Sequence, residues 1–432
     1  MSTPPSWRID LDHFEPLAVG SVELRDDIAA QCEQFVASAQ SNTSSRARLL
    51  LRIDGHPIGY ATTALSDDAF TQSIRDQAMR ELSGHLGRDA SSLSELVSTV
   101  APRPPSLERG RGTVTIVIPT RNRTTSLQRL LDTVEQLNYR DFEVLVVDNC
   151  PSTDTTRAMV RERMRTDPRL RYTTEPIRGG SQARNRGLRS ISSDFVLFAD
   201  DDTVLDRFVL DAMLDGFGRD TAVGCVTGFV TSWELDTLAK ARFDQLSGWG
   251  TKFTARVWSM DSAAGTGPAY PYTAGTFGAG AVYAFRCQAL QQIGFFDTAL
   301  GPGTPAHGAE DMDMFVRTIL SQWSIAYEPS MVAWHDNRPT DEDFRRQIWG
   351  WGVGLSSYVT KLLTSSASRS DVWRRVPAGL RHMRTLNRRD RAARLPLGVV
   401  ATQLAAWTYG PIGYARSRFG VRRDAHRTAP EL

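Results

Sequence analysis

The fold of this chain is decided by the stretch Asp194-Phe195-Val196-Leu197-Phe198-Ala199-Asp200-Asp201-Asp202. Its short apolar run lies between polar residues, which is typical of a buried parallel strand. Open α/β sheets bind ligands at the carboxyl ends of their strands, so three acidic side chains stand where a ligand binds. Because adjacent carboxylates repel one another, the triplet favours a divalent cation together with phosphate oxygens. A solvated acidic turn is the alternative interpretation of the triplet taken alone.

Strand and helix patterns alternate on both sides of this stretch. Apolar runs predict strands at Thr113–Ile118, Phe142–Val147, Leu170–Thr174, Asp194–Ala199 and Ala222–Val230. Helical patterns lie between them, at about 124–137, 153–166, 181–190 and 206–216. Such alternation produces right-handed βαβ units, so we predict an α/β fold with a mainly parallel sheet flanked by helices.

Two further regions flank this sheet. We predict a small α+β N-terminal domain over residues 1–100, a Pro-rich linker over 101–112, the sheet domain over 113–340 and a basic helical C-terminal region over 341–432. In the first region, strand patterns at Arg46–Ile53 and Ile58–Leu65 enclose the turn sequence Asp54-Gly55-His56-Pro57, which predicts a hairpin. Helical patterns follow at roughly 68–86 and 91–99.

Charge is distributed unevenly along the chain. The total is only +2, yet residues 371–432 hold thirteen Arg against three Asp and one Glu, a net charge of +9 that leaves −7 for the remainder. This tail indicates either contact with an anionic membrane surface or a solvated helical face. Residues 395–415 carry no charge but contain prolines, glycines and polar side chains, so an interfacial or core-docked segment is expected rather than a membrane span.

Cysteine spacing and the amino terminus bear on the compartment. The four cysteines are far apart, which disfavours a zinc site and a disulfide framework, and no apolar signal region begins the sequence. Hydrophobic residues make up 41% and charged residues 23%, as in ordinary globular proteins. We therefore expect a cytoplasmic protein, with the inner face of the membrane as the place of any peripheral association.

Polar residues follow three of the predicted strands. The first strand runs into Pro119-Thr120-Arg121-Asn122-Arg123, the second into Asp148-Asn149 and the fourth into the acidic triplet. Because the carboxyl ends of neighbouring parallel strands meet at one edge of the sheet, these residues define one cleft. No Gly-rich turn follows the first strand and no phosphate-loop motif occurs, which argues against two common nucleotide-binding folds.

From about residue 113 to 340 the sequence resembles inverting family-2 glycosyltransferases of the GT-A fold. The resemblance rests on motifs in matching order and spacing: Val117-Ile118-Pro119-Thr120-Arg121-Asn122-Arg123, Val146-Val147-Asp148-Asn149 with Ser152 and Asp154, Gly180-Ser181-Gln182-Ala183-Arg184-Asn185-Arg186-Gly187, Phe198-Ala199-Asp200-Asp201-Asp202, Gly278-Ala279-Gly280, Gly294-Phe295-Phe296-Asp297, Glu310-Asp311-Met312-Asp313 and Trp334-His335. It does not cover residues 1–100, and it covers 341–432 only loosely.

The resemblance implies a nucleotide pocket at these strand ends. Its expected residues are Pro119, Thr120, Asn122, Arg123, Asp148, Arg184, Asp200 and Asp201. Asp148 is expected to accept a hydrogen bond from the nucleobase. Arg184 and Asn185 open a predicted helix after a Gly-Gly-Ser turn, which suits phosphate or ribose. Asp200 and Asp201 are expected to contact ribose or metal-bound water.

The resemblance also implies a metal site and a base. Asp202, the last acid of the D-x-D pattern, is expected to bind Mn²⁺ or Mg²⁺ that bridges the diphosphate, with His335 as a further ligand. Asp311 is the expected base, since inversion requires one carboxylate to take the proton of the acceptor hydroxyl. The structural alternatives are a helix-dipole role for the acids of this first turn, Asp311 among them, and an ordinary core position for His335.

Together these features predict a metal-dependent inverting glycosyltransferase. It would move a sugar from a nucleoside-diphosphate sugar to a hydroxyl acceptor, such as a glycan, a lipid-linked sugar or a small molecule, in glycan or glycoconjugate biosynthesis. No nucleic-acid partner is expected. The alternatives are a non-catalytic nucleotide-sugar-binding module and a sugar-phosphate nucleotidyltransferase; the latter would need a Gly-rich loop after the first strand, and Pro119-Thr120-Arg121 stands there instead.

Overall fold

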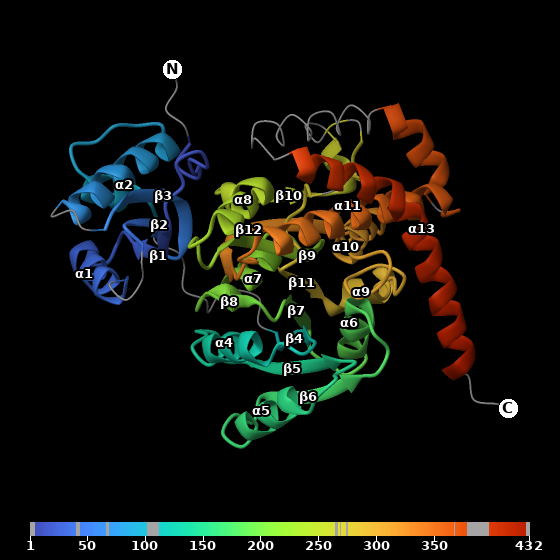
Figure 1. The fold of residues 1–432 in the computed structure, drawn as a ribbon. Helices are drawn as coiled ribbons and strands as arrows, with labels where there is room; N and C mark the ends of the chain where they lie inside the picture. The colour runs from blue at the N-terminus through green and yellow to red at the C-terminus, as the bar shows by residue number, and fades with distance from the viewer. Residues whose placement is uncertain are drawn as a thin grey trace.

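The computed structural model describes residues 5–39, 44–65, 69–101, 112–263, 267, 269–273, 275–366, 368–377 and 397–428. Within these residues the chain forms a three-stranded sheet near the N-terminus and a nine-stranded sheet in the middle, followed by long helices (Figure 1). The predicted linker at 101–112 falls almost entirely outside the described residues, so it stays a prediction.

The nine-stranded sheet is mainly parallel, which confirms the predicted fold class. Its order is β10-β12-β9-β11-β7-β4-β5-β6, with β8 paired to β12. Strands β7, β4, β5 and β6 are parallel neighbours, as are β9 and β12, whereas β8, β10 and β11 run antiparallel to their partners. The strands are β4 (Val114–Thr120), β5 (Phe142–Asn149), β6 (Leu170–Glu175), β7 (Phe195–Ala199), β8 (Thr203–Leu205), β9 (Val223–Ser232), β10 (Arg256–Trp258), β11 (Val282–Arg286) and β12 (Ser324–His335). The antiparallel insertion of β11 between β7 and β9 was not predicted.

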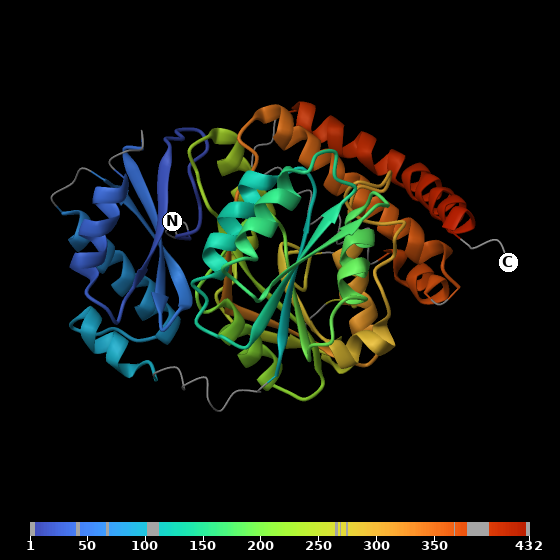
Figure 2. The ribbon, with the colours of Figure 1, turned by 90° about the horizontal axis from the view of Figure 1, so that it is seen from below.

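Helices cover both faces of this sheet (Figure 2). On one face α4 and α7 pack through an apolar cluster that includes Leu130 and Met213. On the other, α6, α9, α10 and α11 pack through a second cluster that includes Phe315 and Tyr358. Continuous burial of β7 follows from this double cover, as expected for a parallel strand. The helices and 3-10 turns are α4 (Thr124–Val134), α5 (Thr155–Arg163), α6 (Gly180–Leu188), α7 (Val209–Gly218), α8 (Leu238–Ser247), η2 (Trp249–Thr251), η3 (Met260–Ala263), α9 (Cys287–Ile293), α10 (Glu310–Leu320) and α11 (Asp341–Thr364).

The N-terminal sheet has the order β1-β2-β3 and packs against three helices. The predicted hairpin is confirmed, because β2 and β3 are antiparallel and Asp54 and Gly55 both have positive φ, as a tight two-residue turn requires. The parallel strand β1 and helix α1 were not predicted. Gly20 explains their close packing, since a Cβ there would stand 2.5 Å from the ring of Phe35. The elements are β1 (Leu17–Glu23), α1 (Ile28–Ala39), β2 (Arg46–Ile53), β3 (His56–Ala64), α2 (Phe70–Leu86) and α3 (Leu93–Thr99).

Buried ion pairs join the N-terminal sheet to the larger one. Arg48 Nη1 lies 2.8 Å from Asp244 Oδ2, and Arg52 Nη1 lies 2.5 Å from Asp206 Oδ2. Both arginines belong to β2, and their side chains are at most 9% exposed. An apolar cluster formed by β2, β3, β8, β9 and β12 surrounds these contacts. The N-terminal region is therefore packed tightly against the sheet that carries the predicted site.

The C-terminal region is helical, as predicted. Helix α13 (Leu397–Thr428) lies along α11 (Figure 1). Glycines permit the close approach: a Cβ at Gly352 would stand 2.6 Å from that of Ala406, and one at Gly410 would stand 2.7 Å from Ser356 Cβ. The uncharged segment, for which an interfacial or a core-docked position was expected, packs against α11 over its described residues. Among the described residues, the helices lack the length and apolar character that crossing a membrane requires.

Candidate functional site

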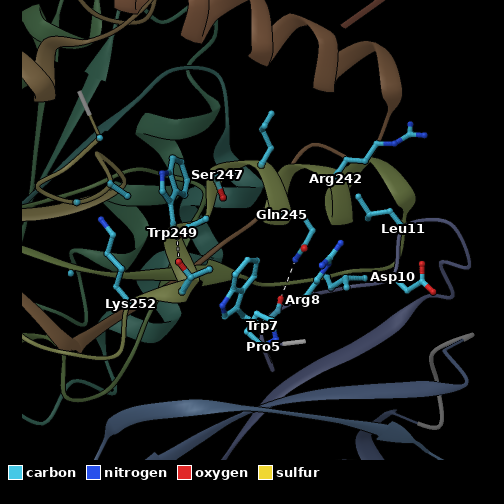
Figure 3. Close-up of a pocket in the computed structure, with 18 of the residues that line it drawn as sticks. Pro5, Trp7, Arg8, Asp10, Leu11, Arg242, Gln245, Ser247, Trp249 and Lys252 are labelled. Atoms are coloured by element: carbon cyan, nitrogen blue, oxygen red, sulfur yellow. Dashed lines mark hydrogen bonds between the residues drawn. The ribbon is translucent and has the colours of Figure 1, made fainter. Parts of the chain in front are cut away.

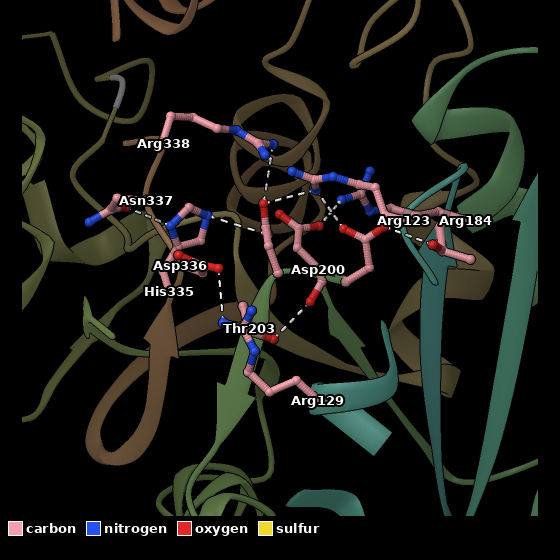
Figure 4. Close-up of polar contacts among 12 residues, drawn as sticks. Arg123, Arg129, Arg184, Asp200, Thr203, His335, Asp336, Asn337 and Arg338 are labelled. Atoms are coloured by element: carbon pink, nitrogen blue, oxygen red, sulfur yellow. Dashed lines mark hydrogen bonds and ion pairs between the residues drawn. The ribbon is translucent and has the colours of Figure 1, made fainter. Parts of the chain in front are cut away.

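The acidic triplet lies directly after β7, beside the carboxyl end of β4 (Figure 4). Asp201 accepts hydrogen bonds from Thr120 Oγ1 at 2.7 Å and from Arg123 Nη1 at 2.6 Å, and the same Nη1 lies 2.9 Å from Asp202 Oδ2. Burial raises the pKa of Asp201 to about 6. For Asp202 burial has the same effect, but the nearby His335 and Arg123 outweigh it and lower the pKa. Asp202 is therefore the acid of this pair that stays ionised most readily.

Arg184 joins the triplet to the start of α10. Its side chain lies in α6, and the residue is 3% exposed. Nη2 lies 2.7 Å from Asp200 Oδ1 and Nη1 lies 2.9 Å from Glu310 Oε1. The structure thus places its terminal nitrogens against carboxylates, and the predicted contact with phosphate or ribose stays a prediction. The neighbouring Asn185 exchanges two hydrogen bonds with the backbone of Phe296 and so fixes the loop before α10.

Asp148, the residue before the last of β5, has a carboxylate with only one oxygen hydrogen-bonded. Its Oδ2 accepts a hydrogen bond from the Tyr172 hydroxyl at 2.8 Å, whereas its Oδ1 is buried without a partner among the described residues. Burial raises the pKa of Asp148. A buried oxygen without a donor is costly, so a ligand N–H would satisfy it. Pro119 is the residue before the last of the neighbouring strand β4, and Asn122, with φ of 55°, accepts a hydrogen bond from the backbone of Ser152.

Asp311 lies in the first turn of α10. The residue before this helix, Ala309, adopts the left-handed conformation with φ of 70°, which turns the chain sharply into the helix. A Cβ at Gly280 would stand 2.8 Å from Asp311 Cγ, so the glycine leaves the space that the carboxyl occupies. Burial raises the pKa of Asp311 and also raises that of Glu310 to about 7.

The third acid of the turn, Asp313, has a different environment. It is 2% exposed and forms ion pairs with Arg317 at 2.9 Å and with Lys361 at 2.6 Å. Lys361 belongs to α11 and also lies 2.8 Å from Asp297. Asp313 therefore connects α10 to α11, while Asp311 faces Gly280.

His335 ends β12 and faces Asp202. Its Nε2 lies 3.4 Å from Asp202 Oδ1, and its Nδ1 lies 2.7 Å from Asn337 Oδ1. Aromatic rings fix the plane of the imidazole: Phe243 stacks on it at 5.9 Å between centroids, and Trp249 meets it edge-on at 5.7 Å.

The donor set of this pair fits a divalent metal. When the proton of the neutral ring lies on Nδ1, two lone-pair atoms, His335 Nε2 and Asp202 Oδ1, face each other with no hydrogen between them, and a cation relieves that arrangement. No cluster of three or more His, Cys, Asp or Glu side chains suited to a metal occurs in the described part of the chain. The further ligands would therefore be diphosphate and water oxygens. Two cations, Arg123 and Arg338, also contact Asp202.

Several residues at the site were missed by the sequence reasoning. Arg338 Nη2 lies 3.4 Å from Asp202 Oδ2, Asn337 contacts His335, and Glu310 pairs with Arg184. Arg338 and Asn337 follow the predicted ligand His335 within three positions, and this adjacency is the one signal that could have drawn attention to them.

A cavity of about 990 Å³ lies beside the site (Figure 3). Its walls come from residues 5 and 7–12, from α8 and η2, from the middle of β9 at Gly228, from Tyr327 of β12 and from the loop before β11. Trp7 and Trp249 supply aromatic faces, while Arg8, Arg242 and Lys252 supply positive charge. Trp249 also contacts His335, and the cavity residue Ala279 precedes Gly280, which abuts Asp311. The cavity therefore reaches the neighbourhood of both the predicted metal ligand and the predicted base.

Comparisons with known proteins agree with this arrangement. Residues 115–293 match the model of the family described as glycosyl transferase family 2. A pre-mycofactocin glycosyltransferase of Mycobacterium tuberculosis is 30% identical over 285 residues, 64% of this chain and 52% of that protein. A GalNAc(5)-diNAcBac-PP-undecaprenol beta-1,3-glucosyltransferase of Campylobacter jejuni is 30% identical over 103 residues, 23% of this chain and 33% of that protein.

Solved structures show a distant likeness as well. The mannosyltransferase PcManGT from Pyrobaculum calidifontis, in complex with GDP-Man and Mn²⁺, covers 80% of this chain and 97% of its own, with 19% identity and a TM-score of 0.46.

The acidic residues lie at strand ends of a mainly parallel sheet, which is the arrangement expected from the resemblance to glycosyltransferases of the GT-A fold. Residues 115–293 are thus similar to glycosyl transferase family 2. The chain spans about half the length of the curated Mycobacterium relative that it matches. The N-terminal sheet, the cavity wall at residues 5–12 and the helices α11 and α13 all lie outside the matched residues.

Proposed function

We propose that this chain transfers a sugar from a nucleoside-diphosphate sugar to a hydroxyl acceptor, with inversion at the anomeric carbon and with a divalent metal bound at Asp202 and His335. The observation that carries the proposal is this pair, whose atoms lie 3.4 Å apart at the acidic edge of the sheet. A metal held there supplies Lewis-acid stabilisation of the charge that develops on the leaving nucleotide. Presence of Mn²⁺ in the mannosyltransferase structure is consistent with such a site.

The donor binds across the carboxyl ends of β4, β5 and β7. Asp148 Oδ1, for which the described part of the chain offers no donor, accepts a hydrogen bond from the nucleobase. Thr120 and Arg123 hold Asp201 in place and so shape the floor beneath the ribose. Arg184 holds Asp200 and Glu310 together, which keeps the nucleotide edge of the cleft and the start of α10 in a fixed relation.

Asp311 acts as the general base. Its carboxylate accepts the proton of the acceptor hydroxyl while that oxygen forms a bond to the anomeric carbon, and the bond from this carbon to the phosphate oxygen breaks on the opposite side. Inversion follows from this single displacement. The pKa of Asp311 is raised by burial, which makes the group a better proton acceptor than an ordinary Asp.

The acceptor occupies the cavity beside the site. A volume of about 990 Å³ exceeds what one sugar ring needs, and cavities of several hundred Å³ are usual for small ligands. The faces of Trp7 and Trp249 suit the apolar faces of sugar rings. We therefore propose that the acceptor is itself a glycoside or a longer glycan, whose far end lies against residues 5–12.

The reaction takes place at the cytoplasmic face of a membrane under this proposal. Helix α13 exposes Leu404 at 65%, Ile412 at 52% and Phe419 at 66%, with Arg416 and Arg418 nearby in the sequence. Exposed apolar side chains together with arginines are the composition of an interfacial helix.

The proposal is tested by incubating the full chain with Mn²⁺ and a panel of UDP-, GDP- and dTDP-sugars, and by measuring nucleoside-diphosphate release. We expect release with one donor class, its loss in Asp202→Ala, and a roughly 10²–10⁴-fold lower turnover in Asp311→Asn with donor affinity retained. Asp313→Asn is the matched control, because it alters an acid of the same turn that faces α11.

Other outcomes would contradict the proposal. Formation of pyrophosphate from a nucleoside triphosphate and a sugar phosphate would identify a nucleotidyltransferase, and donor binding without turnover would identify a binding module. Retention of the donor's anomeric configuration in the NMR spectrum of the product would exclude inversion.

A further inference from the structure

A line of buried polar side chains runs from the N-terminal sheet to His335. Arg48 Nη1 donates to Asp244 Oδ2 at 2.8 Å, and Ser232 Oγ donates to Asp244 Oδ1 at 2.7 Å. Asn337 Nδ2 lies 2.7 Å from Ser232 Oγ, and Asn337 Oδ1 lies 2.7 Å from His335 Nδ1. The line therefore contains four successive hydrogen bonds and ends at the predicted metal ligand.

The direction of every hydrogen bond in this line follows from the Arg48–Asp244 end. A guanidinium only donates and a carboxylate only accepts, so the Ser232 hydroxyl must give its one hydrogen to Asp244. The Ser232 oxygen must then accept from the amide nitrogen of Asn337, which turns the amide oxygen toward His335. Because that oxygen only accepts, Nδ1 of His335 carries the ring proton. The lone pair of the neutral ring therefore lies on Nε2, which faces Asp202.

Burial of these side chains disfavours other arrangements of the hydrogen bonds. Arg48, Ser232, Asn337 and His335 are each between 2% and 7% exposed, so water has little access to replace their partners. The Arg48 guanidinium is itself fixed, because its carbon lies 4.0 Å from the centroid of the Tyr60 ring. A buried polar group left without a partner is costly, which favours the arrangement in which the Asp244, Ser232 and Asn337 side chains all have partners.

We propose that Arg48, Asp244, Ser232 and Asn337 are positioning residues that hold His335 in the Nδ1-protonated tautomer and thereby set the metal affinity of the site. The inference rests on the proposed function for the identity of the ligand, a divalent cation. It gives the N-terminal region, which lies outside the residues matched to the family, a part in building the site. Outer hydrogen-bond partners of a metal-binding imidazole typically contribute 10–100-fold to metal affinity.

Asp244→Asn provides the most specific test. It is expected to exchange the donor and acceptor roles along the line and to keep its hydrogen bonds. The new amide would accept from Arg48 with its oxygen and donate to Ser232 with its nitrogen. The Ser232 hydroxyl would then donate to Asn337, whose amide would rotate and donate to His335 Nδ1. The proton of the ring would move to Nε2, where it blocks metal binding. Asn337→Leu instead removes the last partner and leaves the tautomer unfixed.

The matched control is Asp206→Asn. This substitution neutralises the other buried ion pair between β2 and the large sheet, Arg52 with Asp206, which is not a member of the line that ends at His335. Comparable loss of stability is therefore expected in the control and in Asp244→Asn, and only the latter should alter His335.

Two measurements on the full chain test the tautomer of His335 and its effect on metal affinity. The first is the ¹⁵N NMR spectrum of the histidine side chains in metal-free protein, recorded at rising pH until the His335 ring is neutral. The second is the affinity for Mn²⁺ alone, measured by EPR of the free ion. We expect the Nδ1-protonated form in the wild type and in Asp206→Asn, the Nε2-protonated form in Asp244→Asn, and a roughly 10–100-fold weaker Mn²⁺ affinity in Asp244→Asn and Asn337→Leu.

The inference is overturned by an Nε2-protonated His335 in the wild type, or by a folded Asp244→Asn variant with unchanged tautomer and Mn²⁺ affinity. A wild-type chain that binds no Mn²⁺ would refute the metal role in the proposed function and the affinity part of this inference, and the spectrum would still decide the tautomer. Normal Mn²⁺ binding without sugar transfer would refute only the proposed function.

Discussion

Gly280→Ala should displace the carboxyl group of the proposed base, Asp311, and leave the residue itself unchanged. The added Cβ would stand 2.8 Å from Asp311 Cγ, whereas ordinary contacts of this kind are 3.4–4 Å. The carboxyl group must therefore retreat by on the order of 1 Å, and a misplacement of that size costs about 10²-fold in rate. We expect kcat to fall by about 10²-fold while the affinity for the nucleotide changes little, because the strand ends that hold it do not move.

Gly216→Ala is the control for this prediction. Its Cβ would stand 2.6 Å from Val226 in the core between α7 and β9, far in the sequence from Asp311, so it overpacks the protein to a similar degree. Such overpacking costs about 1–3 kcal/mol of stability in either variant. The assay is nucleoside-diphosphate release at saturating donor, with thermal unfolding measured in parallel. Near wild-type turnover in Gly280→Ala, or an equal loss in Gly216→Ala, would refute the assigned position of the base.

The pH dependence, one helix end and helix α13 can be tested as well. Burial raises the pKa of Asp311, and a general base must be ionised to accept a proton. We therefore expect kcat/KM to fall on the acid side of the pH profile at a higher pH than an ordinary Asp would give. An acid-side pKa at or below about 3.9 in that profile would contradict this. Gln322 is exposed with φ of 64° after the end of α10, so Gln322→Gly should raise the free energy of unfolding by about 1 kcal/mol in denaturant titrations, and a loss of stability would show that no strain exists. The chain should pellet with anionic vesicles at low salt and less as salt rises, since each basic residue near the surface contributes about 1 kcal/mol of binding free energy. The double variant Arg416→Gln with Arg418→Gln should bind more weakly. A chain that stays in the supernatant would refute the interfacial role of α13.

Much of the large sheet was predictable because its strands are buried on both faces. A strand such as Phe195–Ala199 is apolar throughout, and the polar residues that follow it mark the edge of the cleft. Strand β1 escaped prediction since Gly20 and the polar residues around it interrupt the alternating pattern, and its pairing with β2 compensates through packing that the sequence does not display. The antiparallel β11 was missed for a related reason, because direction depends on partners distant in the sequence.

The residues of the site also fall into those that the local sequence predicts and those that it does not. Asp148, Asp202 and Asp311 could be proposed from local motifs, each next to a strand end or a helix start. The pairing of Arg184 with Glu310 and the line that begins at Arg48 could not, because they depend on contacts between residues more than a hundred positions apart, such as Arg184 with Glu310 and Arg48 with Asp244. Such pairings depend on tertiary packing, which periodicity does not encode.

The ion pairs of β2 also have an evolutionary consequence. The ion pairs Arg48–Asp244 and Arg52–Asp206 make the two sheets depend on each other. Loss of either partner of a pair leaves a buried charge, which costs about 3–5 kcal/mol of stability. Recombination that exchanged the first hundred residues between relatives would therefore succeed only when positions 206 and 244 were inherited along with them. Lineages that carry this N-terminal sheet should show paired changes at these positions, and the two sheets should be inherited together as one unit.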